Sequence, residues 1–327
     1  MITMKEIAEQ AGVSSATVSK ILNDNDRYIS SATRDRVMKI IKENNYIPNA
    51  VAKGLKVRRT NTIGFILPDI SNPFFPEIAR GIEDTAENYG FAVTFCDTDN
   101  DPKRELTSFN LLKSKMVDGI IFTRSLHDSN FDDYLADNLP IVVVDRRIDT
   151  EGRNIGKIMV DTRSAMHDAT KLLIEKGCRR IAFIGAKNDF EDARYNGYLD
   201  ALTEAGLDAE ATLCYHDDYN VETGRAGVKE IFGVRMADGL VCGNDLIAVG
   251  AMAVLREMKL RVPEDIRVTG FDDIYFSRYL SPPLTTIKQP AYEMGRAAAH
   301  MLIQNIVNAE PLHTKKLDYT LIPREST

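Results

Sequence analysis

Cysteine, histidine and long apolar segments are all scarce in this chain of 327 residues. Its four cysteines, Cys96, Cys178, Cys214 and Cys242, are widely spaced and form no C-x-x-C pair. This spacing argues against a zinc or disulfide framework. Because Cys96, Cys214 and Cys242 lie in apolar, strand-like runs, we expect buried free thiols. The five histidines are scattered, and we expect neither a metal site nor a catalytic triad.

The sequence also lacks the signatures of membrane proteins and of the common enzyme classes. No apolar run reaches membrane-spanning length and no charged-then-apolar leader is present, so we expect a soluble, cytoplasmic protein. The motifs G-x-S-x-G, H-E-x-x-H and G-x-G-x-x-G are all missing. Residues 152–158 fall one residue short of a Walker spacing, and we interpret them as a loop. An enzyme is disfavoured, and no cofactor is expected.

Charge is divided unevenly along the chain. Residues 1–59 hold 11 lysines and arginines against 6 aspartates and glutamates, a balance of +5. The remainder holds 30 against 42, a balance of −12. A basic head on an acidic body is typical of a small DNA-binding module attached to a larger domain with another task.

The basic head contains a helix-turn-helix pattern. A first helix places Ile7, Ala8 and Ala11 on one face, and Gly12 ends it. Ser14 is a suitable N-cap for a second helix whose apolar residues are Val18, Ile21 and Leu22. A third helix, capped by Ser30 or Ser31, carries Val37, Ile40 and Ile41 and closes a three-helix core. Such a unit fits its second helix into the major groove of DNA.

A short basic segment follows the head. Pro48 ends the preceding structure, and Asn49 can cap a helix of barely two turns that contains Gly54. So short a helix is marginal alone. We interpret residues 48–59 as a hinge helix that forms when DNA and a partner copy hold it, with a plain basic linker as the alternative.

From Thr62 onward, strand-like and helical patterns alternate. The strand-like runs are Ile63–Leu67, Phe91–Cys96, Gly119–Phe122, Ile141–Val144, Ile181–Ile184, Leu240–Cys242 and Ile266–Gly270. Repeated β-α units predict an α/β fold with parallel sheets covered by helices on both faces. Ligands in such folds bind beyond the carboxyl ends of the strands. The polar residues that follow these runs are therefore candidates for a binding site.

The order of these elements resembles the LacI/GalR family of bacterial transcription regulators. The resemblance begins with the helical head, the hinge segment Asn49–Leu55 and the entry Ile63–Phe75. It continues through Asp118-Gly-Ile-Ile, Arg194–Tyr198, Asn244–Gly250, Gly270–Asp273 and Pro283–Pro290, and so covers the whole chain. It implies a helix-turn-helix head, a hinge, and a two-lobed core like periplasmic sugar-binding proteins.

The resemblance also implies domain boundaries. The head spans residues 1–47, the hinge 48–59 and the core 60–327, with chain crossings near 160–161, 288–289 and 319–320. The first lobe then comprises 60–160 plus 290–319, and the second 161–289. The family's cleft between the lobes holds a small-molecule effector.

Several residues match positions that contact DNA in this family. Ser15, Ala16 and Lys20 match the base-reading positions: Lys20 can donate to guanine, and Ala16 can contact a thymine methyl group. Thr17 and Ser19 are suited to phosphates. Leu55 matches the leucine that each subunit inserts into the minor groove. The two-fold symmetry of such a palindromic operator implies a homodimer. The sequence shows no leucine-heptad extension of the kind that would favour a tetramer, so we expect a dimer.

Other residues match, or lie beside, the family's effector site. Carboxylates, an arginine and an asparagine offer hydrogen bonds to sugar hydroxyls, and flat aromatic rings can cover the apolar face of a sugar. The predicted effector-binding residues are Asp69, Phe74, Phe75, Asp145, Arg194, Tyr219, Asn244 and Asp272. For each acidic residue the alternative is an ordinary helix N-cap. As a set they favour a carbohydrate over a nucleobase or another metabolite.

The predicted function is therefore a DNA-binding regulator, by family usage a repressor, that responds to a sugar-like effector. Ligand in the cleft changes the angle between the lobes, and the hinge helices form or melt. The sign of the response, induction or corepression, stays open. The alternatives are a nucleobase-type corepressor and a phosphocarrier protein partner, for which the predicted surface helix 76–90 offers a docking site. A transport component with the same core is disfavoured by the DNA-binding head.

Overall fold

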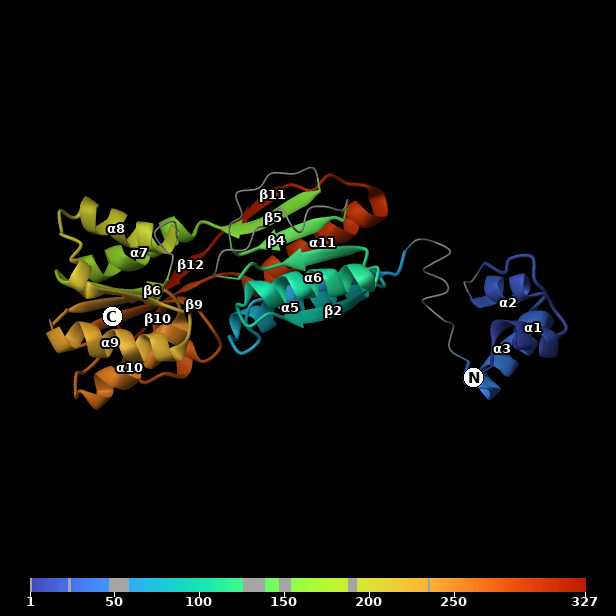
Figure 1. The fold of residues 1–327 in the computed structure, drawn as a ribbon, viewed down its shortest axis with the longest axis horizontal. Coiled ribbons are helices and arrows are strands. Elements are labelled where there is room, and N and C mark those ends of the chain that lie inside the picture. Colours follow the sequence, from blue (N-terminus) through green and yellow to red (C-terminus); the bar gives the residue numbers. More distant parts are fainter. Residues whose placement is uncertain are drawn as a thin grey trace. The chain divides into compact units, whose positions relative to one another are not determined.

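The computed structural model describes residues 2–22, 25–46, 59–125, 139–146, 154–187, 193–234 and 236–327. The chain divides into two compact units, Met1–Thr60 and Asn61–Thr327 (Figure 1). Each unit has a hydrophobic core of its own. All of the predicted hinge except Arg59, including the wedge Leu55, lies outside the described residues.

The first unit is a three-helix head. Its helices are α1 (Met4–Ala11), α2 (Ser15–Leu22) and α3 (Ser31–Glu43). Gly12 ends α1 with a φ of 65°, a left-handed conformation that costs glycine little. Ile7, Val18 and Val37, one from each helix, are fully buried together. The predicted helix-turn-helix is confirmed, and of the two candidate caps for α3 the structure uses Ser30.

The second unit begins with a lobe built on a six-stranded parallel sheet, in the order β11-β5-β4-β3-β1-β2. Its elements are β1 (Thr62–Leu67), α5 (Phe74–Asn88), β2 (Ala92–Asp97), α6 (Pro102–Ser114), β3 (Gly119–Phe122), β4 (Ile141–Val144), β5 (Ile155–Val160), α11 (Ala291–Asn308) and β11 (Thr314–Leu317). Successive side chains of a strand point to opposite faces of the sheet, so apolar residues cover both faces. Phe65 packs with α5 and α11, whereas its neighbour Ile66 packs with α6.

The second lobe is built on the sheet β12-β10-β9-β8-β6-β7. Its elements are α7 (Thr162–Glu175), β6 (Ile181–Ala186), α8 (Ala193–Glu204), η3 (Ala211–Leu213), β7 (Cys214–Asp217), α9 (Val221–Val234), β8 (Gly239–Cys242), α10 (Asp245–Glu257), β9 (Arg267–Asp272), η4 (Ser277–Tyr279), β10 (Thr285–Lys288) and β12 (Thr320–Ile322). Residues of α9 and α10 cover one face and those of α7 and α8 the other. Unlike the parallel arrangement predicted, β12 pairs with β10 in the antiparallel direction.

The chain passes between the two sheets at three places. It leaves the first sheet after β5 and enters the second lobe at α7. It returns to the first lobe between β10 and α11, which packs on α5, and it crosses again between β11 and β12. The two-lobed α/β core that the sequence predicts is confirmed by this topology. Polar residues at the carboxyl ends of β4, β9 and β10 are brought to the same region by these crossings.

Two smaller predictions are wrong. The loop expected at residues 152–158 is in part a strand, because Ile155–Ile158 belong to β5, which the sheet holds between β4 and β11. Cys96 and Cys214 are partly exposed because β2 and β7 are edge strands, while Cys178 and Cys242 are buried. All four thiols are free.

Close helix packing in the first lobe depends on glycine. A methyl group added at Gly81 of α5 would lie 2.1 Å from the carbonyl oxygen of Tyr292 on α11. One added at Gly295 of α11 would lie 2.0 Å from the carbonyl oxygen of Ile78. The two helices therefore approach backbone to backbone, and α5 buries its apolar face against α11 and the sheet.

Candidate functional site

The second helix of the head presents a small polar surface. Ser14 accepts a hydrogen bond from the backbone N–H of Thr17 (3.1 Å) and so caps α2, as predicted. Ser15, Ala16 and Lys20 are exposed, whereas Val18 between them is buried. Thr17 and Ser19, the predicted phosphate-contacting residues, are partly buried. The face of α2 that the sequence assigned to base reading is therefore open to a ligand.

The core brings four polar side chains together where the lobes meet. Gln289, which follows β10, donates from Nε2 to Oδ1 of Asp272 (2.9 Å) in the second lobe. The same amide nitrogen lies 3.4 Å from Oδ1 of Asp145, at the end of β4 in the first lobe. Arg194 on α8 lies 3.7 Å from Asp272 and 4.0 Å from Asp145, measured from Nη2 to Oδ1. We call Asp145, Arg194, Asp272 and Gln289 the cross-lobe cluster.

Arg194 is the cation of this cluster and is held on several sides. It is 7% exposed, and its Nη1 donates to the carbonyl oxygen of Gly243 (2.6 Å). Its guanidinium lies over the ring of Phe271 at 4.2 Å and over that of Tyr219 at 5.0 Å. Such stacking favours a buried guanidinium. Arg194 thus stands pre-oriented between two carboxylates and two aromatic faces.

Burial changes the ionisation of the cluster. Desolvation raises the pKa of the Asp272 carboxyl from 3.8 to about 7, although Arg194 and the Gln289 hydrogen bond act to lower it. The nearby carboxylates Asp245 and Asp145 add to the increase. Oε1 of Gln289 is buried and has no hydrogen-bond partner among the described residues. The cluster therefore offers an acceptor that a ligand hydroxyl can satisfy.

The aromatic residues of the first lobe lie at the start of α5. Phe74 and Phe75 are buried, with their rings edge to face and their centroids 5.3 Å apart. The guanidinium of Arg146, which follows β4, lies 5.7 Å from the Phe75 ring. Arg146 also donates to Oδ1 of Asn100 (2.9 Å) and to the carbonyl oxygen of Arg124 (2.6 Å).

The comparisons with known proteins agree with this architecture. Residues 3–49 match the description "Bacterial regulatory proteins, lacI family", and residues 170–327 match "Periplasmic binding protein-like domain". The transcriptional regulator RegA of Clostridium saccharobutylicum is 41% identical over 332 residues, which cover 99% of each chain. The chain belongs to the LacI family. It is a transcriptional regulator with a DNA-binding head, and not an enzyme.

Other members of the LacI family resemble this chain over its whole length. The ribose operon repressor of Haemophilus influenzae is 38% identical and covers 100% of this chain and 98% of its own. A solved complex of the regulator CelR with cellobiose has a TM-score of 0.76 at 30% identity, with full coverage of both chains. The Lac repressor dimer bound to operator has a TM-score of 0.87 at 26% identity, covering 100% of this chain and 99% of its own.

The structure of this LacI-family core brings together only part of the predicted effector site. Asp145, Arg194 and Asp272 form the cross-lobe cluster, and Tyr219 joins it through Arg194. Asn244 caps α10 by accepting from the Ile247 N–H (2.9 Å), and its Nδ2 lies 3.5 Å from the Tyr219 carbonyl. Asn244 is therefore the N-cap of α10.

Asp69 is engaged within its own turn: its carboxylate accepts from the backbone N–H (2.8 Å) and the hydroxyl (2.6 Å) of Ser71. It therefore shapes the turn that precedes α5. Neither Gln289 nor Arg146 was predicted from the sequence to lie near the effector site. Both follow a strand closely. The same signal identified Asp145 and Asp272, and it could have identified these two residues.

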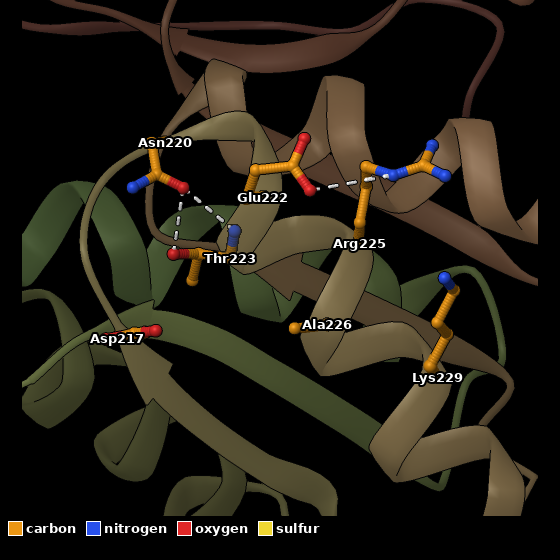
Figure 2. A pocket seen from close by; sticks show the side chains of 7 residues that line it. All are labelled: Asp217, Asn220, Glu222, Thr223, Arg225, Ala226 and Lys229. Carbon is orange, nitrogen blue, oxygen red and sulfur yellow. Dashed lines mark hydrogen bonds and ion pairs between the residues drawn. The ribbon is translucent and has the colours of Figure 1, made fainter.

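A separate hollow of about 310 Å³ lies at the start of α9 (Figure 2). Its polar groups are largely paired within the protein. Asn220 accepts from the backbone N–H (2.9 Å) and the hydroxyl (3.1 Å) of Thr223, and Arg225 forms ion pairs with Glu222 and Glu257. None of the predicted effector residues lines this hollow. It marks a capped helix start and not the site between the lobes.

Within the described ranges, no helix is long and apolar enough to cross a membrane. No cluster of three or more histidine, cysteine or acidic side chains suited to a metal ion occurs in that same part of the chain. Two charged residues of α5 are used internally: Arg80 pairs with Asp84 (3.1 Å), which also accepts from the Tyr292 hydroxyl (3.1 Å).

Proposed function

We propose that this LacI-family regulator is a repressor whose affinity for a palindromic operator is controlled by a sugar bound between the core lobes. The cross-lobe cluster is the observation that carries this proposal. A ligand that contacts Asp145 in one lobe and Asp272 in the other is sensitive to the angle between the lobes. Only a ligand with different affinities for two such arrangements can shift their equilibrium.

The chemistry of the cluster suits a polyol better than an anion. Two carboxylates accompany one arginine in the cluster, and that arginine already donates to a carbonyl group. Carboxylate and amide oxygens accept from hydroxyl groups, and aromatic rings such as that of Tyr219 can pack on an apolar sugar face. The names of two relatives support the same class, since they are a ribose operon repressor and a cellobiose complex.

The DNA side of the proposal rests on the head. Ser15, Ala16 and Lys20 read base edges, Thr17 and Ser19 contact phosphates, and Leu55 of each subunit enters the minor groove. Two copies are needed to match a palindrome, and we propose a homodimer acting in the bacterial cytoplasm. The hinge, residues 48–59, transmits a change in lobe angle to the paired heads.

The test is operator affinity measured with and without sugar. Operator DNA is selected from a random pool by the full-length protein, and fluorescence anisotropy then gives the dissociation constant. We expect D-ribose or cellobiose to change that constant by about fivefold or more, the usual lower range of allosteric coupling. Lys20→Ala weakens operator binding, whereas Lys39→Ala on helix α3 serves as the matched control.

Other outcomes separate the alternatives. A response to adenine or guanine, and to no sugar, would replace the carbohydrate with a nucleobase-type corepressor. A response that requires a phosphorylated carrier protein would move the regulatory site to the surface of the core. Operator affinity that no small molecule or carrier protein changes would refute control through the cleft.

A further inference from the structure

Asp245, the first residue of α10, is fully buried but is not part of the cross-lobe cluster. Its Oδ2 accepts from the backbone N–H of Ile274 (2.9 Å) and from the hydroxyl of Ser277 (2.5 Å). Its Oδ1 accepts from the hydroxyl of Thr286 on β10 (2.6 Å). One carboxylate therefore joins α10, β10 and the segment that leaves β9.

The segment that leaves β9 is conformationally unusual. Asp272 and Asp273 have φ values of 108° and 53°, a backbone region that residues other than glycine rarely adopt. Such residues are strained and persist only where their surroundings hold them. Arg324 holds Asp273 through an ion pair of 2.5 Å, and Asp245 holds the next residue, Ile274, through its N–H.

The same turn reaches both lobes. Asp272 belongs to the cross-lobe cluster, and Ile274, although it comes from the second lobe, is buried in the hydrophobic cluster of the first lobe. Between β9 and the carboxylate there is no spare room, because a methyl group at Gly270 would lie 2.2 Å from Oδ1 of Asp245. A shift of Asp245 would therefore move the turn and the Asp272 carboxylate with it.

We propose that Asp245 is a positioning residue for sugar binding, which holds the turn 272–277 so that Asp272 faces Arg194 and Gln289. The inference rests on the proposed sugar site. Asp245 does not touch the ligand. It fixes the backbone from which the ligand-binding carboxylate projects, and it places Ile274 between the lobes.

Asp245 also acts on Asp272 through its charge. The groups that face Asp272 are Arg194 from α8, Asp145 after β4, Asp245 from α10 and the amide of Gln289. Arg194 lowers the pKa of Asp272, whereas Asp245 and Asp145 raise it. Burial raises the pKa of Asp245 itself to about 6. Replacing Asp245 by a neutral amide therefore lowers the pKa of Asp272.

The test is calorimetric titration of the full-length protein with D-ribose and with cellobiose between about pH 6 and pH 8. If the sugar binds the ionised form of Asp272, a pKa of about 7 makes wild-type affinity about tenfold weaker at pH 6 than at pH 8. Asp245→Asn weakens binding at pH 8 and reduces this pH ratio well below ten. Ser277→Ala, which keeps both carboxyls, weakens binding by about threefold to tenfold through the turn.

Asp238→Asn is the matched control. Asp238 directly precedes β8, at the end of the strand remote from the cluster. Its carboxylate accepts hydrogen bonds from the backbone N–H groups of Arg179 and Arg180. It should lose stability but keep the affinity and the pH ratio. The inference is wrong if Asp245→Asn and Ser277→Ala bind sugar like wild type, or if they weaken binding only as much as Asp238→Asn does. If Asp245→Asn does not fold, the sugar affinity of Ser277→Ala alone tests the inference. If wild type binds neither sugar, the proposed function fails, and the inference fails with it.

Discussion

Asp272→Asn should make the protein's stability respond to pH in a defined way. Asp272 is 6% exposed, and burial raises the pKa of its carboxyl from 3.8 to about 7. The folded state therefore holds a proton that the unfolded state releases between these two values. The contribution of this group to the free energy of unfolding is present at low pH and is lost as pH rises toward and through 7. At higher pH its contribution no longer changes.

The size of the effect follows from the same pKa. Between pH 6 and pH 8, the unfolded carboxyl is ionised throughout, whereas the folded carboxyl goes from mostly protonated to mostly ionised. A group with a folded pKa of about 7 then contributes roughly 1.4 kcal/mol more at pH 6 than at pH 8. The amide that replaces the carboxyl in Asp272→Asn carries no such proton. The variant should therefore gain about that much relative to wild type on going from pH 6 to pH 8.

Urea unfolding of the full-length protein at fixed concentration, followed by far-ultraviolet circular dichroism, measures this difference. Asp265→Asn is the control, because its carboxylate is bound by Arg261 and its pKa is lowered to about 2. Its effect on unfolding free energy should be the same at pH 6 and pH 8. A constant difference between Asp272→Asn and wild type across this range would refute the assignment of a buried, proton-binding carboxyl between the lobes.

Two further predictions test other parts of the structure. Leu55→Ala should weaken operator binding at least about tenfold, because the apolar wedge is lost, yet leave sugar affinity in calorimetry unchanged; equal losses of both would contradict the hinge assignment. Gly81→Ala should lower the free energy of unfolding by about 1–3 kcal/mol because the new methyl group meets the Tyr292 carbonyl. Gly233→Ala is its control: the new methyl group meets nothing within 4 Å, so urea unfolding should show unchanged or slightly higher stability. An unchanged free energy of unfolding in Gly81→Ala would show that α5 and α11 are less closely packed than in this structure.

The sequence predicted the parts of the fold that have strong local patterns. The helices of the head follow from apolar residues three or four positions apart within each helix, such as Ile7 and Ala11 or Val18 and Ile21. They follow also from the Ser14 and Ser30 caps, which act within three residues of their partners. Buried strands such as β4 and β8 are continuous apolar runs and were equally clear. The short strands β7, β11 and β12 are only partly buried, so their sequences carry little of the pattern that marks a strand.

The site was predicted less completely because its contacts are long-range. Gln289 and Asp145 are separated by 144 positions in the sequence, and they come into contact only in the folded chain. The role of Asp245 depends on Ile274, Ser277 and Thr286, none of which is near it in sequence. Asp69 shows that a position after a strand does not by itself bring a side chain into the cross-lobe cluster. It follows a strand, as Asp145 does, but its carboxylate is used by Ser71, two residues away.

The most direct test of an effector site between the lobes is sugar binding by wild type and by Arg194→Ala, measured by calorimetry with D-ribose and cellobiose. Arg163→Ala is the matched control, since Arg163 pairs with Asp200 on the surface between α7 and α8. We expect wild type and Arg163→Ala to bind one of these sugars with equal affinity, and Arg194→Ala, although folded, not to bind it. Undiminished binding by Arg194→Ala would show that the effector is held elsewhere than in the cross-lobe cluster.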